Sequence, residues 1–316
     1  MSAQNPVTKT SFENEVGARG GPRSGELLAL EVLLAEARDA RVPVLRRLRL
    51  VATLARRIDA FFQLQVPALR GRGRLVALRA RTAALSTAAR ALLETELLPA
   101  LAARGVSLAS WDALAAGERA NLTRLFAAEV SPLLTPLTVD AGHPFPCVAS
   151  LALNLAVLAR APRQLEPRYV GIEVPPTLPR FVALPRSDRV LCIEDVIGAN
   201  LGTLLPGLEV ASHHVFRVTR DGRPRRSPGP WSGEPAGGPS PRTRAAVRLE
   251  LEAGAPPALR RMLVEALALQ DDEVYEVAGA LDLCGLASLP VARALHGSTG
   301  GLARSARPSD SGRGSA

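Results

Sequence analysis

The spacing of hydrophobic residues divides this chain into two parts. Up to residue 130, hydrophobic residues recur three and four positions apart, as in Leu48, Val51 and Leu54, which is the pattern of an amphipathic helix. Proline and glycine interrupt the pattern, because proline lacks the N–H that a helix interior needs. The pattern predicts helices over residues 26–40, 43–69, 74–104 and 110–130. Short connections between them predict an all-α helical bundle.

After Pro146 the hydrophobic residues form short runs bounded by prolines, which is typical of strands. The predicted strands cover residues 150–159, 168–174, 180–185, 213–220 and 245–252. Helical patterns lie at 193–204 and 256–268. The expected fold class is therefore α+β, with the helical bundle followed by an α+β domain that has a mainly antiparallel sheet.

Composition suggests where the ordered parts begin and end. We expect a disordered arm at 1–24, a helical domain at 25–131, an α+β middle domain at 132–296 and a disordered tail at 297–316. Within the middle domain, residues 221–243 are dominated by Gly, Pro, Ser and Arg and predict a mobile loop.

The chain has 316 residues, of which 47% are hydrophobic but only 3% aromatic, so the core must be built from Leu, Ala and Val. The formal net charge is +9, and Lys9 is the only lysine among 39 basic residues. A base-composition bias in the coding DNA is one explanation of arginine in place of lysine. A polyanionic partner is the second explanation, because guanidinium groups bind phosphate oxygens bidentately.

Cysteine usage and hydropathy favour a cytoplasmic protein. Cys147, Cys192 and Cys284 are odd in number, far apart and match no metal-binding spacing. The first 25 residues have no apolar core typical of a signal peptide, and no apolar run reaches the roughly 18 residues of a membrane span. We therefore expect no integral membrane segment. We also expect no DNA partner.

No catalytic or metal-binding residue stands out from spacing alone. His143 lies between turn signals and favours a structural role, and His213 and His214 are adjacent on a predicted strand, so they face opposite sides. Asp271, Asp272 and Glu273 are interpreted as solvated acids in a turn. Phe61 and Phe62 are assigned to the core.

A series of blocks resembles the long, ATP-dependent polyphosphate kinases. The blocks include VPVLRRLRLVATLARRIDAFFQLQVPALR, LFAAEVSPLLTPLTVDAGHPFPCVASLALNLAVL, IEDVIGANLGTLLPGLEV and HHVFRVTRD, and together they cover about residues 40–290 in the family's order. The resemblance implies the N-terminal and middle domains of that family. It also implies polyphosphate synthesis from ATP with Mg²⁺, through a phosphorylated histidine.

The resemblance also points to site residues. Arg57 stands where the family has an ATP-contacting Asn, whereas the family's Asp is kept as Asp59. An Asn both donates and accepts hydrogen bonds at an adenine edge, but Arg only donates. Asp59 is also placed to form a local salt bridge with Arg56. Arg217 and Arg220, three apart on one strand, are candidates for polyphosphate contacts, one lining an anion path and the other pairing with an acidic side chain.

In this family the histidine that takes the phosphate lies in the C-terminal half, and this sequence stops at Ala316 before it. The first hypothesis is a truncated or diverged polyphosphate kinase homologue that is inactive alone. The second is a non-catalytic protein that binds polyphosphate or pairs with a full-length kinase, and the third is a relic that barely folds. A homo-oligomer is a further option, and a separate chain carrying the catalytic half would instead indicate a split enzyme.

Overall fold

The computed structural model describes residues 22–69, 75–139, 145–164, 167–185, 187–223 and 244–290, with the side chains of 22–24 left out. Most of the predicted arm at 1–24, nearly all of the predicted loop at 221–243 and the predicted tail at 297–316 lie outside these residues. His143 and His296 also lie outside them.

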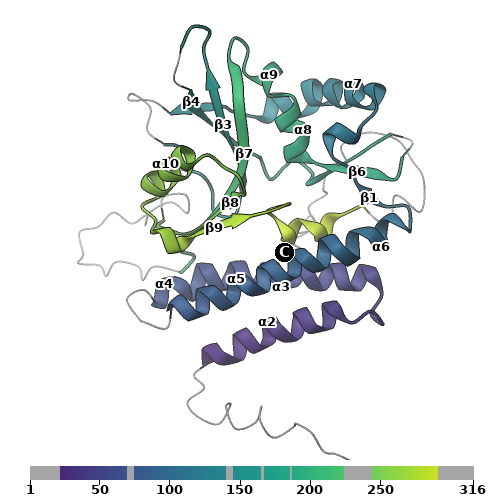
Figure 1. The fold of residues 1–316 in the computed structure, drawn as a ribbon, viewed down its shortest axis with the longest axis vertical. Helices are drawn as coiled ribbons and strands as arrows, with labels where there is room; N and C mark the ends of the chain where they lie inside the picture. The colour runs from purple at the N-terminus through teal and green to yellow at the C-terminus, as the bar shows by residue number, and fades with distance from the viewer. Residues whose placement is uncertain are drawn as a thin grey trace, which may run out of the picture.

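Three helices form a layer beneath the sheet in Figure 1, with α2 on the side of α3 and α5 away from the strands. The helices of this part are α2 (Pro22–Arg38), α3 (Val44–Leu64), α4 (Val66–Leu69), α5 (Leu75–Leu92), the π-helical turn η1 (Leu93–Leu97) and α6 (Leu98–Ala102). The prediction of helices at 26–40, 43–69 and 74–104 is confirmed, although the second ends near Leu64 and resumes at Val66.

The fourth predicted helix differs from the expectation. Residues 110–130 form the 3₁₀ turn η2 (Trp111–Ala113), α7 (Ala116–Leu125) and the π-helical turn η3 (Phe126–Val130), followed by η4 (Ser131–Leu133). Leu122, Phe126 and Val130 pack in the same hydrophobic cluster as the sheet, and not with α2, α3 and α5. The reason is that their apolar face is buried by β-strand side chains, which the helical spacing does not reveal.

The strands form two sheets. The larger has the order β2 (Leu137–Val139), β4 (Arg168–Glu173), β3 (Leu153–Arg160), β7 (Glu209–Arg220), β8 (Ala246–Glu252), β9 (Val274–Val277). The smaller has the order β1 (Ser107–Leu108), β6 (Arg189–Cys192), β5 (Phe181–Ala183). Only β8–β9 and β1–β6 pair in parallel among the described strands. The α+β fold with a mainly antiparallel sheet is therefore confirmed.

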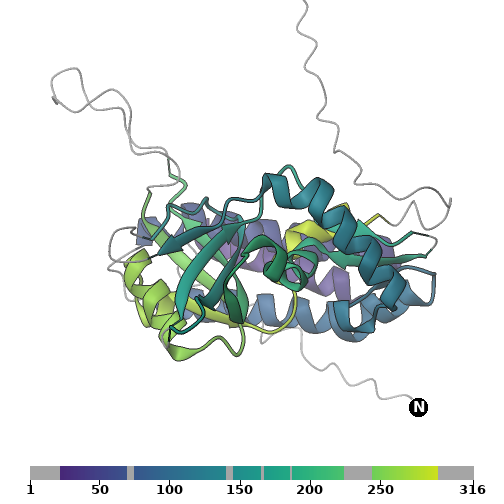
Figure 2. The same ribbon diagram turned by 90° about the horizontal axis from the view of Figure 1, so that it is seen from above.

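Short helices complete the sheet region: α8 (Ile193–Ala199), α9 (Leu201–Leu204), α10 (Pro257–Leu267), η6 (Asp271–Glu273) and η7 (Leu283–Ser288). The predicted helix at 193–204 is divided at Asn200, whose amide Nδ2 donates to the carbonyl of Val196 at 2.8 Å. Seen from above, the purple helices lie behind the strands of the sheet (Figure 2).

Alternation along β7 gives the large sheet two different faces. Phe216 and Val218 point into a hydrophobic cluster with α10, together with Leu249 and Leu251 from β8. Arg217 and Thr219 therefore point to the other face, toward α3, because successive strand residues face opposite sides. This face, between the sheet and α3, holds the buried charged residues Asp59, Arg217, Arg248 and Glu250.

Candidate functional site

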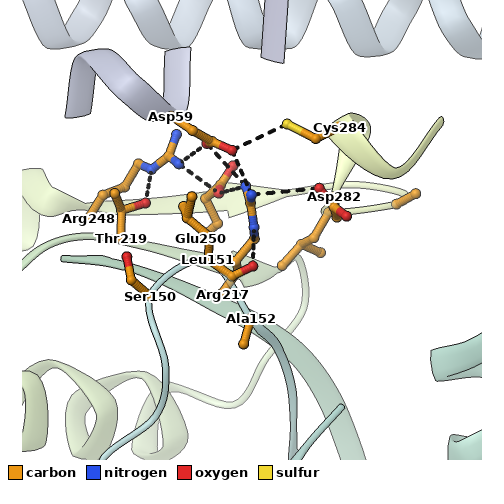
Figure 3. Close-up of polar contacts among 12 residues, drawn as sticks. Asp59, Ser150, Leu151, Ala152, Arg217, Thr219, Arg248, Glu250, Asp282 and Cys284 are labelled. Atoms are coloured by element: carbon orange, nitrogen blue, oxygen red, sulfur yellow. Dashed lines mark hydrogen bonds and ion pairs between the residues drawn. The ribbon is translucent and has the colours of Figure 1, made fainter. Parts of the chain in front are cut away.

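A network of buried charges joins α3 to β7 and β8. Asp59, on the buried side of α3, accepts two hydrogen bonds from Arg217: Nη2 lies 2.6 Å from Oδ2 and Nη1 lies 3.1 Å from Oδ1. Arg248 Nη2 lies 2.5 Å from Asp59 Oδ1. All three side chains are less than 10% exposed. Figure 3 shows both guanidinium groups converging on this one carboxylate from neighbouring strands.

Two further carboxylates, Glu250 and Asp282, complete the network. Glu250 Oε2 lies 3.2 Å from both Arg217 Nη1 and Arg248 Nη2, and its Oε1 lies 3.5 Å from Arg90 Nη2 on α5. Asp282 Oδ1 lies 3.6 Å from Arg217 Nη2. Three carboxylates therefore face three guanidinium groups, so the charges balance within the protein.

Strand register places these side chains together. Arg217 on β7 lies opposite Glu250 on β8, and Thr219 lies opposite Arg248. Arg248 Nε donates to Thr219 Oγ1 at 3.0 Å, and Arg217 Nε donates to the carbonyl of Leu151 at 3.0 Å. The Nε–H groups of both arginines thus find acceptors other than a carboxylate, as buried donors require.

Burial and pairing act against each other on the pKa of these groups. Burial raises the pKa of Asp59, but Arg248 and Arg217 outweigh it and hold that pKa below its ordinary value. Burial alone lowers the pKa of Arg217, whereas Asp59 and Glu250 raise it above its ordinary value. The thiol of Cys284 donates to Asp59 Oδ2 at 3.3 Å, and burial raises its pKa to about 12. Asp59 and Arg217 are therefore both ionised at neutral pH, with a neutral thiol beside them.

Other candidate residues lie away from this network. The imidazole of His213 lies against Gly198 of α8, and burial lowers its pKa. The expectation that residues 271–273 are merely solvated is wrong for Glu273. This side chain is buried and bonded to Arg79 at 2.6 Å, because Arg79 projects from α5 toward η6. Within the part of the chain that the structure describes, no three His, Cys, Asp or Glu side chains are grouped to hold a metal ion.

Comparisons with known proteins identify the family. Residues 117–224 match the family model described as the polyphosphate kinase middle domain. A protein named polyphosphate kinase from Thermosynechococcus vestitus is 33% identical over 82% of this chain and 40% of its own length. One of the same name from Streptomyces coelicolor is 36% identical over 81% of this chain and 37% of its own length. The chain belongs to the polyphosphate kinase family.

The fold agrees with that relationship. A crystal structure of polyphosphate kinase from Porphyromonas gingivalis superposes with a TM-score of 0.73 at 23% identity, covering 86% of this chain and 41% of that chain. This polyphosphate kinase homologue spans about two fifths of the length of the curated relatives it matches. The middle-domain match begins inside α7, the helix that packs with the sheet.

The two positions carried over from polyphosphate kinases have different surroundings. Arg57 is exposed on α3 and takes no part in the network. Asp59 is buried, and its partners are Arg217 and Arg248, so the expected salt bridge with Arg56 is wrong. The reason is that Arg56 lies on the exposed side of α3, whereas Asp59 points to the sheet. An ATP contact at either position stays a prediction.

Arg217 and Arg220 lie in separate surroundings. Arg217 is the one that pairs with acidic side chains. Arg220 Nε donates to the carbonyl of Val148 at 3.0 Å, and Nη1 donates to that of Arg244 at 2.7 Å. Burial lowers the pKa of Arg220. Both guanidinium groups are thus occupied by protein acceptors, and their contact with polyphosphate stays a prediction.

Sequence reasoning missed Arg90, Arg248, Glu250 and Asp282. A signal for two of them is present in AVRLELE, where Arg248 and Glu250 alternate with apolar residues and therefore share one face of the strand. The guanidinium of Arg248 also lies over the ring of Phe62, 4.4 Å from its centroid. The assignment of Phe61 and Phe62 to the core is confirmed, since both are almost fully buried.

No described helix combines the length and the apolar character needed to cross a bilayer.

Proposed function

We propose that residues 22–290 of this polyphosphate kinase homologue act as a scaffold, and that the 316-residue chain does not transfer phosphate by itself. The observation that carries this proposal is the internal neutralisation of the Asp59 network. Phosphoryl transfer needs cations aimed at the transferred group and an acceptor within reach. In the network every guanidinium group is aimed at a protein carboxylate or carbonyl.

The described residues also fit ATP and Mg²⁺ poorly. Arg57 offers an adenine edge only donors, whereas the family's Asn offers both a donor and an acceptor. The buried acids Asp59 and Glu250 already bind guanidinium groups and lie too deep to hold a hydrated cation. We therefore assign no step of the family's reaction to these side chains.

Turnover and binding on one sample test the proposal. The purified 316-residue protein is incubated with labelled ATP, Mg²⁺ and polyphosphate, with the Thermosynechococcus vestitus relative as the positive control. We expect no elongation and no acid-labile phosphate on His213 or His214. Elongation above that of a heat-denatured sample would overturn the proposal, because the chain would then hold a transfer site of its own.

A second candidate function is polyphosphate binding. Arg49, Arg56 and Arg57 lie on the exposed side of α3, and none has an acidic partner among the described residues. Three free guanidinium groups on one helix face suit a flexible polyanion. This row of arginines, in contrast to buried Arg217 and Arg220, is open to a ligand from solvent.

Salt dependence and matched variants test this second candidate. Changing Arg49, Arg56 and Arg57 together to Gln should abolish polyphosphate binding measured by calorimetry. The same change at exposed Arg163, Arg168 and Arg261 removes equal charge elsewhere and should leave most of the binding. A slope of log Kd against log salt of about 2–3 is expected if three contacts release counterions, by analogy with nucleic acids. Equal losses in both triple variants would indicate attraction by net charge alone.

The homology suggests a full-length polyphosphate kinase as a partner of this chain. A mixed oligomer of the two proteins should elute as one species in size-exclusion chromatography. Two separate peaks at micromolar concentration would remove this partner.

A further inference from the structure

A groove of about 520 Å³ lies beside the charge network, between α5 and the outer edge of β9. On the helix side, residues spaced three and four apart present one face of α5, and most have small side chains: Ala83, Ser86, Thr87 and Ala91. On the strand side, the five consecutive residues 274–278 line the groove. Phe62 and Arg248 also line it.

The strand that borders the groove has a free edge. β9 is the outermost strand of the large sheet and pairs with β8 alone among the described strands. Alternate backbone N–H and C=O groups of an edge strand point away from the sheet and can pair with another chain. The small side chains of α5 leave room there for an added strand, which lies about 4.8 Å from its neighbour.

The polar groups of the groove are not all satisfied by the protein. Arg90 and Arg248 both pair with Glu250. Glu94 and Glu276 are exposed at the groove, and no ion pair involves either of them among the described residues. The hydroxyl of Tyr275 is buried and has no hydrogen-bond partner among those residues. The groove therefore offers unpaired negative charge and one unused hydroxyl beside a free strand edge.

We propose that this groove binds an extended, basic peptide segment of a partner protein, which adds as a strand to the outer edge of β9. Main-chain hydrogen bonds to β9 give the segment its affinity, as in other cases of strand addition. Basic side chains of the segment pair with Glu94 and Glu276. This binding does not depend on any phosphoryl transfer by the chain.

A labelled hexapeptide of alternating arginine and valine is the probe. Fluorescence anisotropy with the 316-residue protein should show saturable binding. Methylation of alternate backbone nitrogens on the edge that pairs should weaken binding more than tenfold, because it removes the donors but keeps the charge. A glutamate–valine peptide of the same length should not bind.

Variants of the protein locate the site. Glu94→Gln and Glu276→Gln should each weaken binding about threefold to fivefold, the range of a partly exposed ion pair. Glu265→Gln, an equal loss of charge on exposed α10, should have no effect. Thr87→Trp fills the groove from an exposed helix position and should abolish binding. If Thr87→Trp does not fold, Ala91→Arg fills the groove from a second exposed position on the same helix.

Three results would overturn the proposal. Equal affinity for the methylated peptide would show attraction by charge without strand addition. Unchanged binding by both filling variants would place the peptide elsewhere. Unchanged affinity in both Glu94→Gln and Glu276→Gln would contradict pairing of the segment with these two acids.

Discussion

At the scale of single residues, Asp59 shows how a family position can have a structural role. Taking a carboxylate and two guanidinium groups out of water costs several kcal/mol per ion, and only close, multiple hydrogen bonds repay that cost. Asp59 has such bonds, because Arg217 approaches it bidentately and Arg248 approaches from the next strand. Removing one partner should therefore lower the free energy of unfolding by more than the whole network adds to it, because a buried charge is left unpaired.

Replacing Asp59 by Asn tests this arrangement. The change leaves two buried guanidinium groups short of one negative charge, so the free energy of unfolding should fall by about 3–5 kcal/mol. Urea unfolding followed by circular dichroism measures the loss. Glu209→Gln is the control, since it breaks the exposed pair with Arg160 and should cost about 0–1 kcal/mol. Equal losses in both variants would contradict a buried, charge-balanced network.

Asp195 on α8 gives a prediction for pH. Burial and the neighbouring Glu194 raise its pKa to about 7, although Arg180 acts in the opposite sense, and Glu252 adds to the rise. An unfolded aspartate has a pKa of about 3.9. Between about pH 4 and 7 the unfolded chain therefore releases a proton that the folded protein keeps, so this group lowers the stability of the fold as the pH rises.

Asp195→Asn should remove the loss of stability that the Asp195 carboxyl causes as the pH rises. Relative to the wild type, the variant should gain stability between pH 4 and pH 7, and the gain should level off above about pH 8. Asp195 is nevertheless exposed on α8, so solvent screens its charge and the effect should be small. Urea midpoints at pH 4, 6 and 8 measure it. If the variant and the wild type differed in stability by the same amount at all three pH values, the pKa of Asp195 would not be raised by folding.

At the scale of elements, the sequence predicts secondary structure better than it predicts contacts. The apolar face of α3 and the run of apolar residues in β3 are visible because each follows its own period. The short strands β1, β2 and β6 are missed, because two to four residues carry too little pattern. The charge network is missed for a different reason: it depends on the register of β7 and β8 and on the approach of α3.

The contact between α8 and β7 gives an element-scale prediction. A Cβ added at Gly198 would lie 2.4 Å from Nε2 of His213, whereas nothing lies within 4 Å of one added at Gly202. Gly198→Ala should therefore destabilise the protein by about 1–3 kcal/mol through overpacking. Gly202→Ala should stabilise it by about 0.4–1 kcal/mol, because alanine loses less backbone entropy on folding. Thermal unfolding compares the pair.

Rescue identifies the cause of that loss. In the Gly198→Ala background, His213→Ala should restore part of the lost stability, because it removes the ring that the new methyl group meets. Equal stability of the two glycine variants would show that α8 shifts freely on the sheet.

At the scale of the whole molecule, the hydrophobic cluster of the helical layer includes residues from the strands. The largest hydrophobic cluster contains Leu54 and Phe61 from α3, Cys192 from β6, Val247 from β8 and Leu283 from η7. The Asp59 network crosses the same boundary. The apolar cluster of the helical layer therefore extends into both sheets.

A shared core predicts cooperative unfolding. Cys192 is buried in β6, and Cys284 lies beside Asp59, so each thiol becomes reactive only when its contacts open. In urea, both thiols should react with a disulfide reagent at the same midpoint at which helical circular dichroism is lost, whereas exposed Cys147 should react in the folded protein. In Asp59→Asn all three midpoints should move together to lower urea. If Cys284 reacted well before the helical signal fell, α3 would separate from the sheet before either part unfolds, and the network would be a hinge between two independent units.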